Sequence, residues 1–367
     1  MMELSDNMNR IVFFDGTLRE GGAERVISIL SNVMAQTTNY KVSIALWYDE
    51  EPFYEIDERV DIIRIPQKTK KSSFFGNFFW LRKYMKNECD TIISFLAPFN
   101  VLALLAHLGL KCPIIVADRN NPKKVPSNFF IRKARDFLYL CADRVVLQTE
   151  QNDMYFSYIK ESKRRVIYNP ICLKEKTGLA LGMEKKKKIV SVGRLIEQKN
   201  QKMMINAFSK LEKKYPNYEL WIYGEGNYRD ELERLIRELG LEKKVFLPGN
   251  SKDIFTVISD AEFFVMSSNY EGMPNALLEA MCLGLPVIST KVSGAIDVIK
   301  NEYNGLLVDI DDIDGLIIAM DKLFSDEELR ANLAKSACQL AEELAPEKIV
   351  SQWWELIEQC KERQKDV

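Results

Sequence analysis

The sequence predicts an α/β protein made of two doubly wound, parallel-sheet domains. Its 367 residues exceed the roughly 100–200 residues of one typical domain. Short apolar runs of strand length alternate with helix-like stretches, and this alternation is typical of parallel sheets covered by helices. The pattern lapses once near the middle of the chain and then starts again, so we expect two such domains.

In the first half, apolar runs rich in Val, Ile and Phe mark the strands, and apolar residues at helical spacing mark the helices. We expect strands at residues 11–14, 42–47, 91–95, 114–117 and 144–147, with helices at 23–34 and 101–108.

Residues 91–110 carry no formal charge and are numerous enough to span a bilayer. We interpret them as a buried strand, a turn around Pro98 and Asn100, and a short apolar helix, because Pro and Asn interrupt the run.

The second half repeats the alternation after an exposed linker, which we place within residues 170–188. We expect strands at residues 189–192, 219–223, 245–247, 263–266, 287–289 and 306–308, with helices at 201–214, 228–239 and 274–283. Residues 346–364 predict a terminal helix, with Trp353, Trp354 and Ile357 on the face that packs against another element.

Composition excludes several classes of protein. Hydrophobic residues make up 47% of the chain and charged residues 28%, without low-complexity bias, so disordered and fibrous proteins are excluded. Seven cysteines without CxxC spacing indicate thiols in a reducing compartment, and the polar start of the chain does not resemble a signal peptide. We therefore expect a cytoplasmic protein.

The single histidine, His107, excludes sites that need several imidazoles, such as His-rich zinc sites. It lies in an apolar run, where we expect a core histidine whose hydrogen bonds are satisfied.

The strongest motif covers the strand at 263–266, the loop NYEGM and the helix that follows. Asn275 and its neighbours begin this helix, and their N–H groups suit a phosphate. Glu271 in the loop and Glu279 in the helix flank that position. Carboxylates accept hydrogen bonds from sugar hydroxyls, so the arrangement favours a nucleotide sugar. The alternative is a loop residue and a solvated helix residue without function.

A second motif follows the strand at 189–192. Gly193 ends the strand, and Arg194 and Lys199 lie at the same sheet edge as Glu271. These cations suit a diphosphate and could stabilise its charge as a leaving group. The alternative is a pair of ordinary surface cations.

Two weaker motifs follow strands of the first half. Gly21 and Gly22 precede a helix and permit close approach of a ligand to the backbone, although neither a GxGxxG nor a P-loop pattern is present. Asp118, Arg119 and Asn120 follow another strand and could orient an acceptor, or they could form a turn.

Residues 68–86 begin with Lys68, end with Lys86 and contain six basic residues, six aromatic residues and no acidic residue. This composition suits an anionic membrane surface. An ordinary core helix with a solvated face is the alternative, and the net charge of −2 disfavours nucleic acid.

Taken together, these motifs identify a resemblance. SVGRLIEQKNQKMMINAFSKL and SSNYEGMPNALLEAMCLGLPV resemble the nucleotide-binding half of family 4 retaining glycosyltransferases, which have the GT-B fold of two Rossmann-like domains. GGAER and ADRNNP look like bacterial transferases that extend undecaprenyl-diphosphate-linked glycans, N-acetylgalactosamine transferases among them. Several relatives carry His where this chain has Arg119.

The resemblance implies domains at 1–172 and 173–349, with the terminal helix 350–367 returning to the first. It implies a UDP-sugar donor, a polyprenyl-diphosphate-linked acceptor, no metal or other cofactor, and a peripheral position on the inner face of the cell membrane. The implied catalytic residues are Arg194, Lys199 and Glu271. The implied donor-binding residues are Gly21, Gly22, Gly193, Gly249, Gly272, Met273, Pro274, Asn275 and Glu279. The implied acceptor-side residues are Asp118, Arg119 and Asn120.

A non-catalytic nucleotide-sugar or glycan-binding protein of the same fold is the competing class. A phosphorylase or an epimerase of related architecture is a further alternative.

Overall fold

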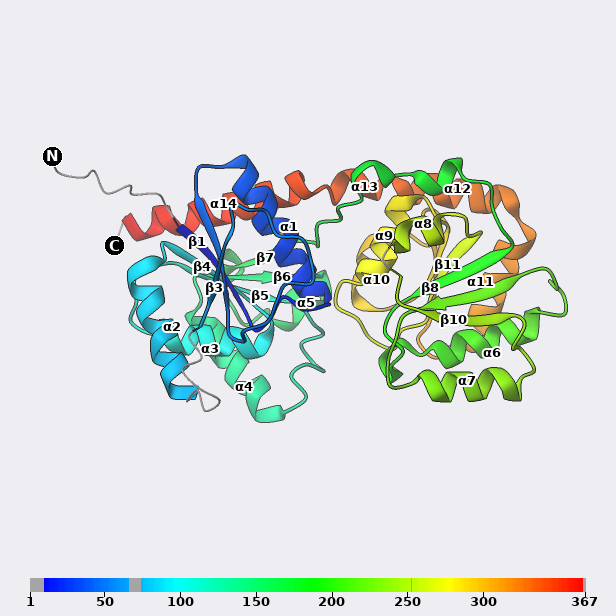
Figure 1. Ribbon diagram of the computed structural model, residues 1–367, viewed down its shortest axis with the longest axis horizontal. Helices are drawn as coiled ribbons and strands as arrows, with labels where there is room; N and C mark the ends of the chain where they lie inside the picture. The colour runs from blue at the N-terminus through cyan, green and yellow to red at the C-terminus, as the bar shows by residue number, and fades with distance from the viewer. Residues whose placement is uncertain (1–9, 66–73, 252, 366–367) are drawn as a thin grey trace. The chain divides into compact units, whose positions relative to one another are not determined.

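The structure is a computed structural model that describes residues 10–65, 74–251 and 253–365 (Figure 1). The chain divides into two compact units. Unit 1 extends to Pro170 and includes the chain from Ala345 onward, whereas unit 2 is Ile171–Leu344. The terminal segment therefore joins unit 1 at residue 345, and the first crossing lies two residues before the boundary implied by the resemblance.

Unit 1 contains a seven-stranded sheet in the order β3-β2-β1-β4-β5-β6-β7, and its strand pairings are parallel. Each strand that the sequence predicts is present, and two short edge strands, β3 and β7, are added. The strands are β1 (Arg10–Asp15), β2 (Lys41–Leu46), β3 (Asp61–Arg64), β4 (Thr91–Phe95), β5 (Ile114–Asp118), β6 (Arg144–Leu147) and β7 (Arg164–Val166).

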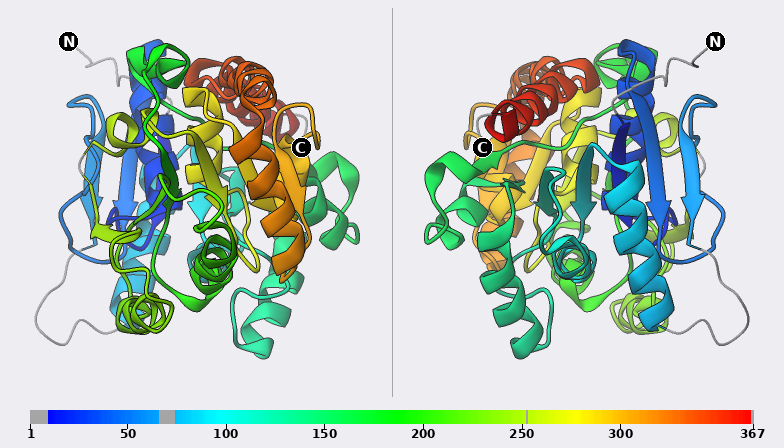
Figure 2. Two further views of the ribbon diagram at one scale, coloured as in Figure 1. Left: turned by 90° about the vertical axis from the view of Figure 1, so that its right-hand side faces the viewer. Right: turned by 90° about the vertical axis from the view of Figure 1, so that its left-hand side faces the viewer.

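Helices cover both faces of this sheet (Figures 1 and 2). The side chains of β1 alternate between two hydrophobic clusters, because successive strand residues point to opposite faces. One cluster contains α1 (Gly22–Thr37) and α14 (Pro346–Lys365), and the other contains α2 (Phe74–Glu88) and α3 (Ala97–His107). Helices α4 (Phe129–Leu138) and α5 (Glu150–Tyr155) complete unit 1.

The terminal helix α14 packs on unit 1 through the apolar face that the sequence predicts. Trp353 is fully buried, and its ring stacks on Phe95 with the centroids 5.9 Å apart. Trp354, one position on, is partly buried and lies 4.8 Å from the ring of Tyr40. The two tryptophans therefore attach α14 to the end of β4 and to the residue that precedes β2.

Unit 2 contains a six-stranded parallel sheet in the order β10-β9-β8-β11-β12-β13. The strands are β8 (Lys188–Val192), β9 (Glu219–Tyr223), β10 (Val245–Gly249), β11 (Phe263–Met266), β12 (Val287–Thr290) and β13 (Leu306–Val308). The helices are α6 (Gln201–Leu211), α7 (Arg229–Glu238), α8 (Ile254–Ser259), α9 (Asn275–Leu283), α10 (Ser293–Val298), α11 (Ile313–Ser325), α12 (Glu327–Cys338) and α13 (Leu340–Glu343).

In unit 2 the strand order reverses between β8 and β11, which are neighbours in the sheet. Helices α6, α7 and α11 pack on one face, and α8, α9 and α10 lie on the other (Figure 1). The carboxyl ends of β8 and β11 are therefore a topological switch point, which is where open α/β sheets bind ligands.

One predicted turn is wrong. Pro98 and Asn100 lie inside α3, which begins at Ala97 rather than at residue 101. Proline is accepted in the first turn because its missing N–H needs no partner there. The Asn100 side chain is buried, and its Nδ2 donates to the Ala117 carbonyl at 3.0 Å and to the Tyr139 hydroxyl at 2.7 Å.

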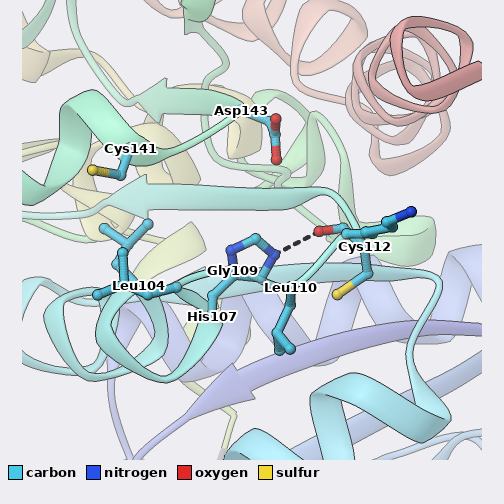
Figure 3. A pocket seen from close by; sticks show the side chains of 9 residues that line it. Leu104, His107, Gly109, Leu110, Cys112, Cys141 and Asp143 are labelled. Carbon is cyan, nitrogen blue, oxygen red and sulfur yellow. Dashed lines mark hydrogen bonds between the residues drawn. The ribbon is translucent and has the colours of Figure 1, made fainter. Parts of the chain in front are cut away.

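His107 ends α3 and lines a pocket at the amino end of β5, together with Cys112, Cys141 and Asp143 (Figure 3). Its Nε2 donates to the Cys112 carbonyl at 2.6 Å. The expectation of a satisfied hydrogen bond is confirmed, but the ring is half-buried rather than enclosed in the core.

Candidate active site

The centre of the site is an ion pair between Lys199 and Glu271. Lys199 ends the short 3-10 turn Glu197–Lys199 that follows β8, and Glu271 lies in the loop that follows β11. Lys199 Nζ is 2.6 Å from Glu271 Oε1, and the Ser268 hydroxyl donates to the same oxygen at 2.7 Å. The switch point between the two strands thus brings together the charges that the two sequence motifs supply.

Contacts from the end of β11 hold the lysine turn in place. The Ser267 hydroxyl bonds to the carbonyls of Lys199 and Asn200, at 3.1 and 2.9 Å. Gln198 Nε2 donates to the Tyr270 carbonyl at 2.8 Å. The turn that carries Lys199 and the loop that carries Glu271 are therefore hydrogen-bonded to each other. The Lys199 ammonium is positioned before any ligand binds.

Helix α9 starts directly after the Glu271 loop. The helix begins at Asn275, one residue later than the sequence predicts. Pro274 therefore occupies the N-cap position instead of the first helical position. The Leu277 N–H is already bonded to the Pro274 carbonyl at 3.0 Å, which removes it from the predicted anion site. Gly284 ends the helix at φ +82°, in the left-handed conformation that glycine adopts without a steric penalty.

Glu279 lies in the second turn of α9 and is buried. Gly272 and Met273 form the loop before the helix, and the Gly272 carbonyl accepts the Gly294 N–H at 2.9 Å. A Cβ on Gly294 would lie 2.4 Å from that carbonyl oxygen. Gly294 therefore permits the start of α10 to approach the loop, a role that the sequence motifs did not indicate.

Three glycines end the neighbouring strands β8, β9 and β10. Gly224 adopts φ +139°, and a Cβ there would lie 2.1 Å from the Gly193 carbonyl oxygen. Its N–H donates to the Gly249 carbonyl at 2.9 Å. Gly224 therefore packs against two glycines that the resemblance implies at the donor site, Gly193 and Gly249.

The unit 2 residues of the predicted donor site therefore gather at one edge of the sheet. Arg194 follows Gly193 and its side chain is exposed, whereas Lys199 and Glu271 are largely covered. A carboxylate pair, an ammonium, a guanidinium and the start of a helix are a suitable set of groups for a diphosphate joined to sugars. Among the described residues no group of three or more His, Cys, Asp or Glu is arranged to hold a metal ion.

The remaining predicted residues belong to unit 1, where Gly21 and Gly22 start α1. The Glu24 carboxylate lies against Gly21, since a Cβ on Gly21 would be 2.1 Å from Glu24 Oε2. The Tyr54 hydroxyl donates to the Gly21 carbonyl at 3.1 Å. A carboxylate already faces this helix start and must move before a phosphate binds there.

Asp118 and Arg119 do not present their side chains at the surface, contrary to the acceptor-side expectation. Asp118 is buried beneath the Tyr139 hydroxyl, which donates to it at 3.1 Å, and burial raises its pKa. Asn120 donates its N–H to Asp118 Oδ1 at 3.3 Å. This is the turn that the sequence left open as an alternative.

Arg119 points to the opposite face of the sheet from Asp118. Its guanidinium carbon lies 4.7 Å from the Phe95 ring centroid and 5.7 Å from that of Trp353. Burial lowers its pKa to about 9. Arg119 thus packs beneath α14. These contacts do not indicate that Arg119 takes the role of the histidine that relatives carry at this position.

The chain matches the family described as "Glycosyl transferases group 1" over residues 180–339. It is 30% identical over 363 residues to the "GalNAc-alpha-(1->4)-GalNAc-alpha-(1->3)-diNAcBac-PP-undecaprenol alpha-1,4-N-acetyl-D-galactosaminyltransferase" of Campylobacter jejuni, covering 96% of this chain and 99% of that protein. It is 27% identical over 357 residues to the amylovoran biosynthesis glycosyltransferase AmsD of Erwinia amylovora, covering 95% and 99% of the two chains.

Solved structures agree in fold. Anabaena Alr3699/HepE in complex with UDP-glucose matches with a TM-score of 0.79 at 18% identity, over 95% of this chain and 99% of that chain. The sucrose-phosphate synthase of Thermosynechococcus elongatus matches with a TM-score of 0.81 at 19% identity, over 96% and 98%.

Proposed function

The chain belongs to the glycosyl transferases of group 1 and has the GT-B fold, and from this premise we propose that it transfers a sugar from a UDP-sugar to an undecaprenyl-diphosphate-linked glycan. The observation that carries the proposal is the Lys199–Glu271 pair at the switch point of unit 2, beside the start of α9. The alternative of a non-catalytic binding protein receives no support from the comparisons.

For the donor, the geometry supports one role for each charged group. Lys199 and Arg194 bind the diphosphate, together with N–H groups at the start of α9. Glu271 accepts hydrogen bonds from hydroxyls of the transferred sugar, and Glu279 accepts them from the ribose. Solved structures of the same fold carry UDP and UDP-glucose, which favours uridine as the nucleoside.

We place the chemical step at this ion pair. The bond between the anomeric carbon and the UDP oxygen breaks as the acceptor hydroxyl oxygen bonds to that carbon on the same face, with retention. The acceptor proton moves to the departing phosphate oxygen. Lys199 and Arg194 stabilise the negative charge that develops on the diphosphate, so the reaction needs no metal.

For the acceptor, the support comes from the relatives. Two Campylobacter jejuni proteins, each 30% identical to this chain, are named for transfer to undecaprenol-linked glycans. An acceptor with such a lipid tail brings the reaction to a membrane surface, so we propose a peripheral position on the inner face of the cell membrane. No helix among the described residues has the length and apolarity needed to cross a bilayer.

The segment 68–86 was predicted to contact that membrane. Its residues 68–73 lie outside the described residues, and the remainder begins α2. There Phe75, Phe79, Lys83 and Lys86 are exposed at helical spacing, and Leu81 and Met85 are buried beneath them. The buried and exposed sides of α2 are those of the core-helix alternative, and we propose in addition that the exposed side contacts anionic headgroups.

The test is a thermal-shift series followed by a transfer assay. UDP and UDP-sugars, but not GDP or ADP, should raise the unfolding midpoint, because a ligand of the folded state stabilises it. A water-soluble, short-chain prenyl-diphosphate glycan should then gain one sugar. Lys199→Ala should reduce both the UDP-induced shift and the rate of transfer, and Lys210→Ala, which removes an exposed lysine of α6, should reduce neither. Binding of UDP without transfer to any lipid-linked acceptor would overturn the proposed acceptor.

A further inference from the structure

Unit 1 contains a cavity of about 510 Å³ between its terminal helix and the last two strands of its sheet. The walls come from the amino ends of β6 and β7 and from the side of α14 that carries residues 352–359. Asp118 ends β5, so it lies at the opposite edge of this parallel sheet. The cavity therefore includes none of the site residues that the sequence predicts in unit 1.

One wall of the cavity carries a buried guanidinium. Arg144 is the first residue of β6 and is only 3% exposed. It points to the sheet face that α14 covers, because alternate strand residues share a face and Val146 packs in one cluster with Leu356. Arginine is seldom buried unless a counter-charge accompanies it. The contacts of Arg144 therefore indicate what the cavity binds.

Arg144 pairs with no carboxylate of the described chain. Its Nη1 donates to the Asp143 carbonyl at 3.0 Å, and its Nε and Nη2 have no partner among the described residues. These two nitrogens are not enclosed by protein, in contrast to Nε and Nη2 of Arg119. Since Arg144 lines the cavity, they face it. A buried charge without a counter-charge lowers stability, and an anion in the cavity would supply that counter-charge.

A second guanidinium lies at the rim of the cavity. Arg165 of β7 is opposite Val146 in the sheet register, and its side chain is therefore on the same face as Arg144. This side chain is 56% exposed. Its Nη2 lies 3.9 Å from Glu355 Oε2, which is beyond hydrogen-bond distance. Arg165 is therefore available to a ligand as well.

The rest of the lining offers hydrogen-bonding groups rather than further free cations. Arg164 also lines the cavity, but its guanidinium pairs with Asp153 at 2.6 Å. The other polar side chains of the lining are Glu161, Ser162, Gln352, Glu355 and Gln359. Carboxylates and amide oxygens accept hydrogen bonds from hydroxyl groups. The lining thus combines two guanidinium groups for an anion with acceptors for hydroxyls.

We propose that this cavity binds a phosphorylated sugar. The phosphate bonds to the open Nε–Nη2 side of Arg144, where a guanidinium holds two oxygens at once, and to Arg165. The sugar hydroxyls bond to Glu355, Gln352 and Gln359 of α14. A phosphate monoester, with a charge near −2, matches two guanidinium groups better than a carboxylate does. The inference does not depend on the proposed function, because no residue of the donor site takes part.

The test is calorimetric titration of the full chain with glucose-6-phosphate, with and without UDP. We expect saturable binding with the same affinity in both conditions. Arg144→Lys should weaken it at least about tenfold, because the charge remains but the two-oxygen contact is lost. Arg165→Gln should weaken it by about tenfold, and this exposed substitution leaves the buried side of the sheet unchanged. The matched control is Arg234→Gln, at an exposed arginine of α7, and it should bind like the unchanged chain.

Thermal unfolding separates a binding role of Arg144 from a structural one. Arg144→Met replaces the unpaired charge with an apolar side chain of similar length. Without ligand its unfolding midpoint should be no lower than that of the unchanged chain. Glucose-6-phosphate should raise the midpoint of the unchanged chain and not that of the variant. A lower midpoint of the variant without ligand would make Arg144 a structural residue and would overturn the inference.

Other outcomes would also overturn it. One is absence of binding at millimolar glucose-6-phosphate, and another is unchanged affinity in both Arg144→Lys and Arg165→Gln. Loss of binding when UDP is present would assign the sugar phosphate to the donor site instead. Equally tight binding of inorganic phosphate would remove the role of the hydroxyls, and equally tight binding of glucuronate would remove that of the phosphate.

Discussion

Lys199 Nζ lies 2.6 Å from Glu271 Oε1, so the cation proposed for the diphosphate is held by the carboxylate proposed for the sugar. The two residues are far apart in the sequence and meet because β8 and β11 are neighbours. This pair places the charge for the leaving group beside the sugar that departs from it. Donor binding has little to reorganise at this position, which is the condition for effective electrostatic stabilisation.

Removing the ammonium should affect the reaction more than the fold. We expect Lys199→Ala to lower kcat by about 10²–10³, the range found when one group that stabilises transition-state charge is deleted. Steady-state kinetics with the soluble acceptor measures this loss. Lys210→Ala is the control, and a Lys199→Ala enzyme with unchanged kcat would remove the assigned role.

The Ser268 hydroxyl should position Glu271 rather than react. Ser268→Ala removes one of the two donors to Glu271 Oε1. Because Glu271 is assigned to the sugar, we expect KM for the UDP-sugar to rise by about five- to tenfold, equivalent to one lost hydrogen bond, with the affinity for UDP little changed. Calorimetric titration with UDP and with the UDP-sugar measures the two affinities separately. An equal loss for UDP would indicate general damage to the site.

Gly224 should tolerate no side chain. Gly224→Ala places a Cβ against the Gly193 carbonyl, so the ends of β8 and β9 must separate. Gly240→Ala is the matched control, because Gly240 also has a positive φ, of +67°, but has open space around it. We expect Gly224→Ala to lose UDP binding and to have the lower unfolding midpoint. Equal midpoints for the two variants would contradict the steric explanation.

Trp353 should contribute most of the attachment of α14 to unit 1. Its ring is fully buried against Phe95, so Trp353→Ala should lower the free energy of unfolding by about 3–5 kcal/mol. Trp354→Ala should cost clearly less because Trp354 is only partly buried. Urea unfolding measures the free energy of unfolding of both variants. An equal loss of stability in the two would show that the stack of Trp353 on Phe95 is not the main attachment of α14.

The buried Asp15 should make stability depend on pH. Burial raises the pKa of its carboxyl well above the ordinary value, and the charge of Glu24 raises it further. The folded protein then holds this proton more tightly than the unfolded chain. Stability therefore falls as the pH rises above the unfolded pKa of about 3.9, until the folded pKa is passed.

Asp15→Asn keeps the acceptor for the Gly16 N–H and removes the titration. We expect the midpoint of the variant to exceed that of the unchanged chain at pH 8, and the difference to shrink by roughly a few degrees at pH 5. Thermal melts of both proteins between pH 5 and pH 8 measure this difference in unfolding midpoint. A difference that does not vary with pH would contradict the assignment.

The sequence predicted the strands of unit 2 more completely than those of unit 1, although helices α8, α10, α11, α12 and α13 of unit 2 were not expected. Every unit 2 strand was expected, and the central strands β8, β11 and β12 are short runs buried on both faces. In unit 1 the edge strands β3 and β7 are short and only partly buried, so their sequences lack that signal. Helix α4 escaped prediction for a related reason, since its exposed phenylalanines obscure the usual apolar pattern.

By itself the sequence determined two parallel-sheet domains and the group 1 motifs, because strand runs and the spacing between Glu271 and Glu279 are local properties of the chain. Only the tertiary structure decided which of the candidate residues meet. Lys199 reaches Glu271 because the strand order reverses between β8 and β11. Asp118 and Arg119 turn into the core because the residues that end a strand still alternate between its two faces, and here both faces are covered by helices.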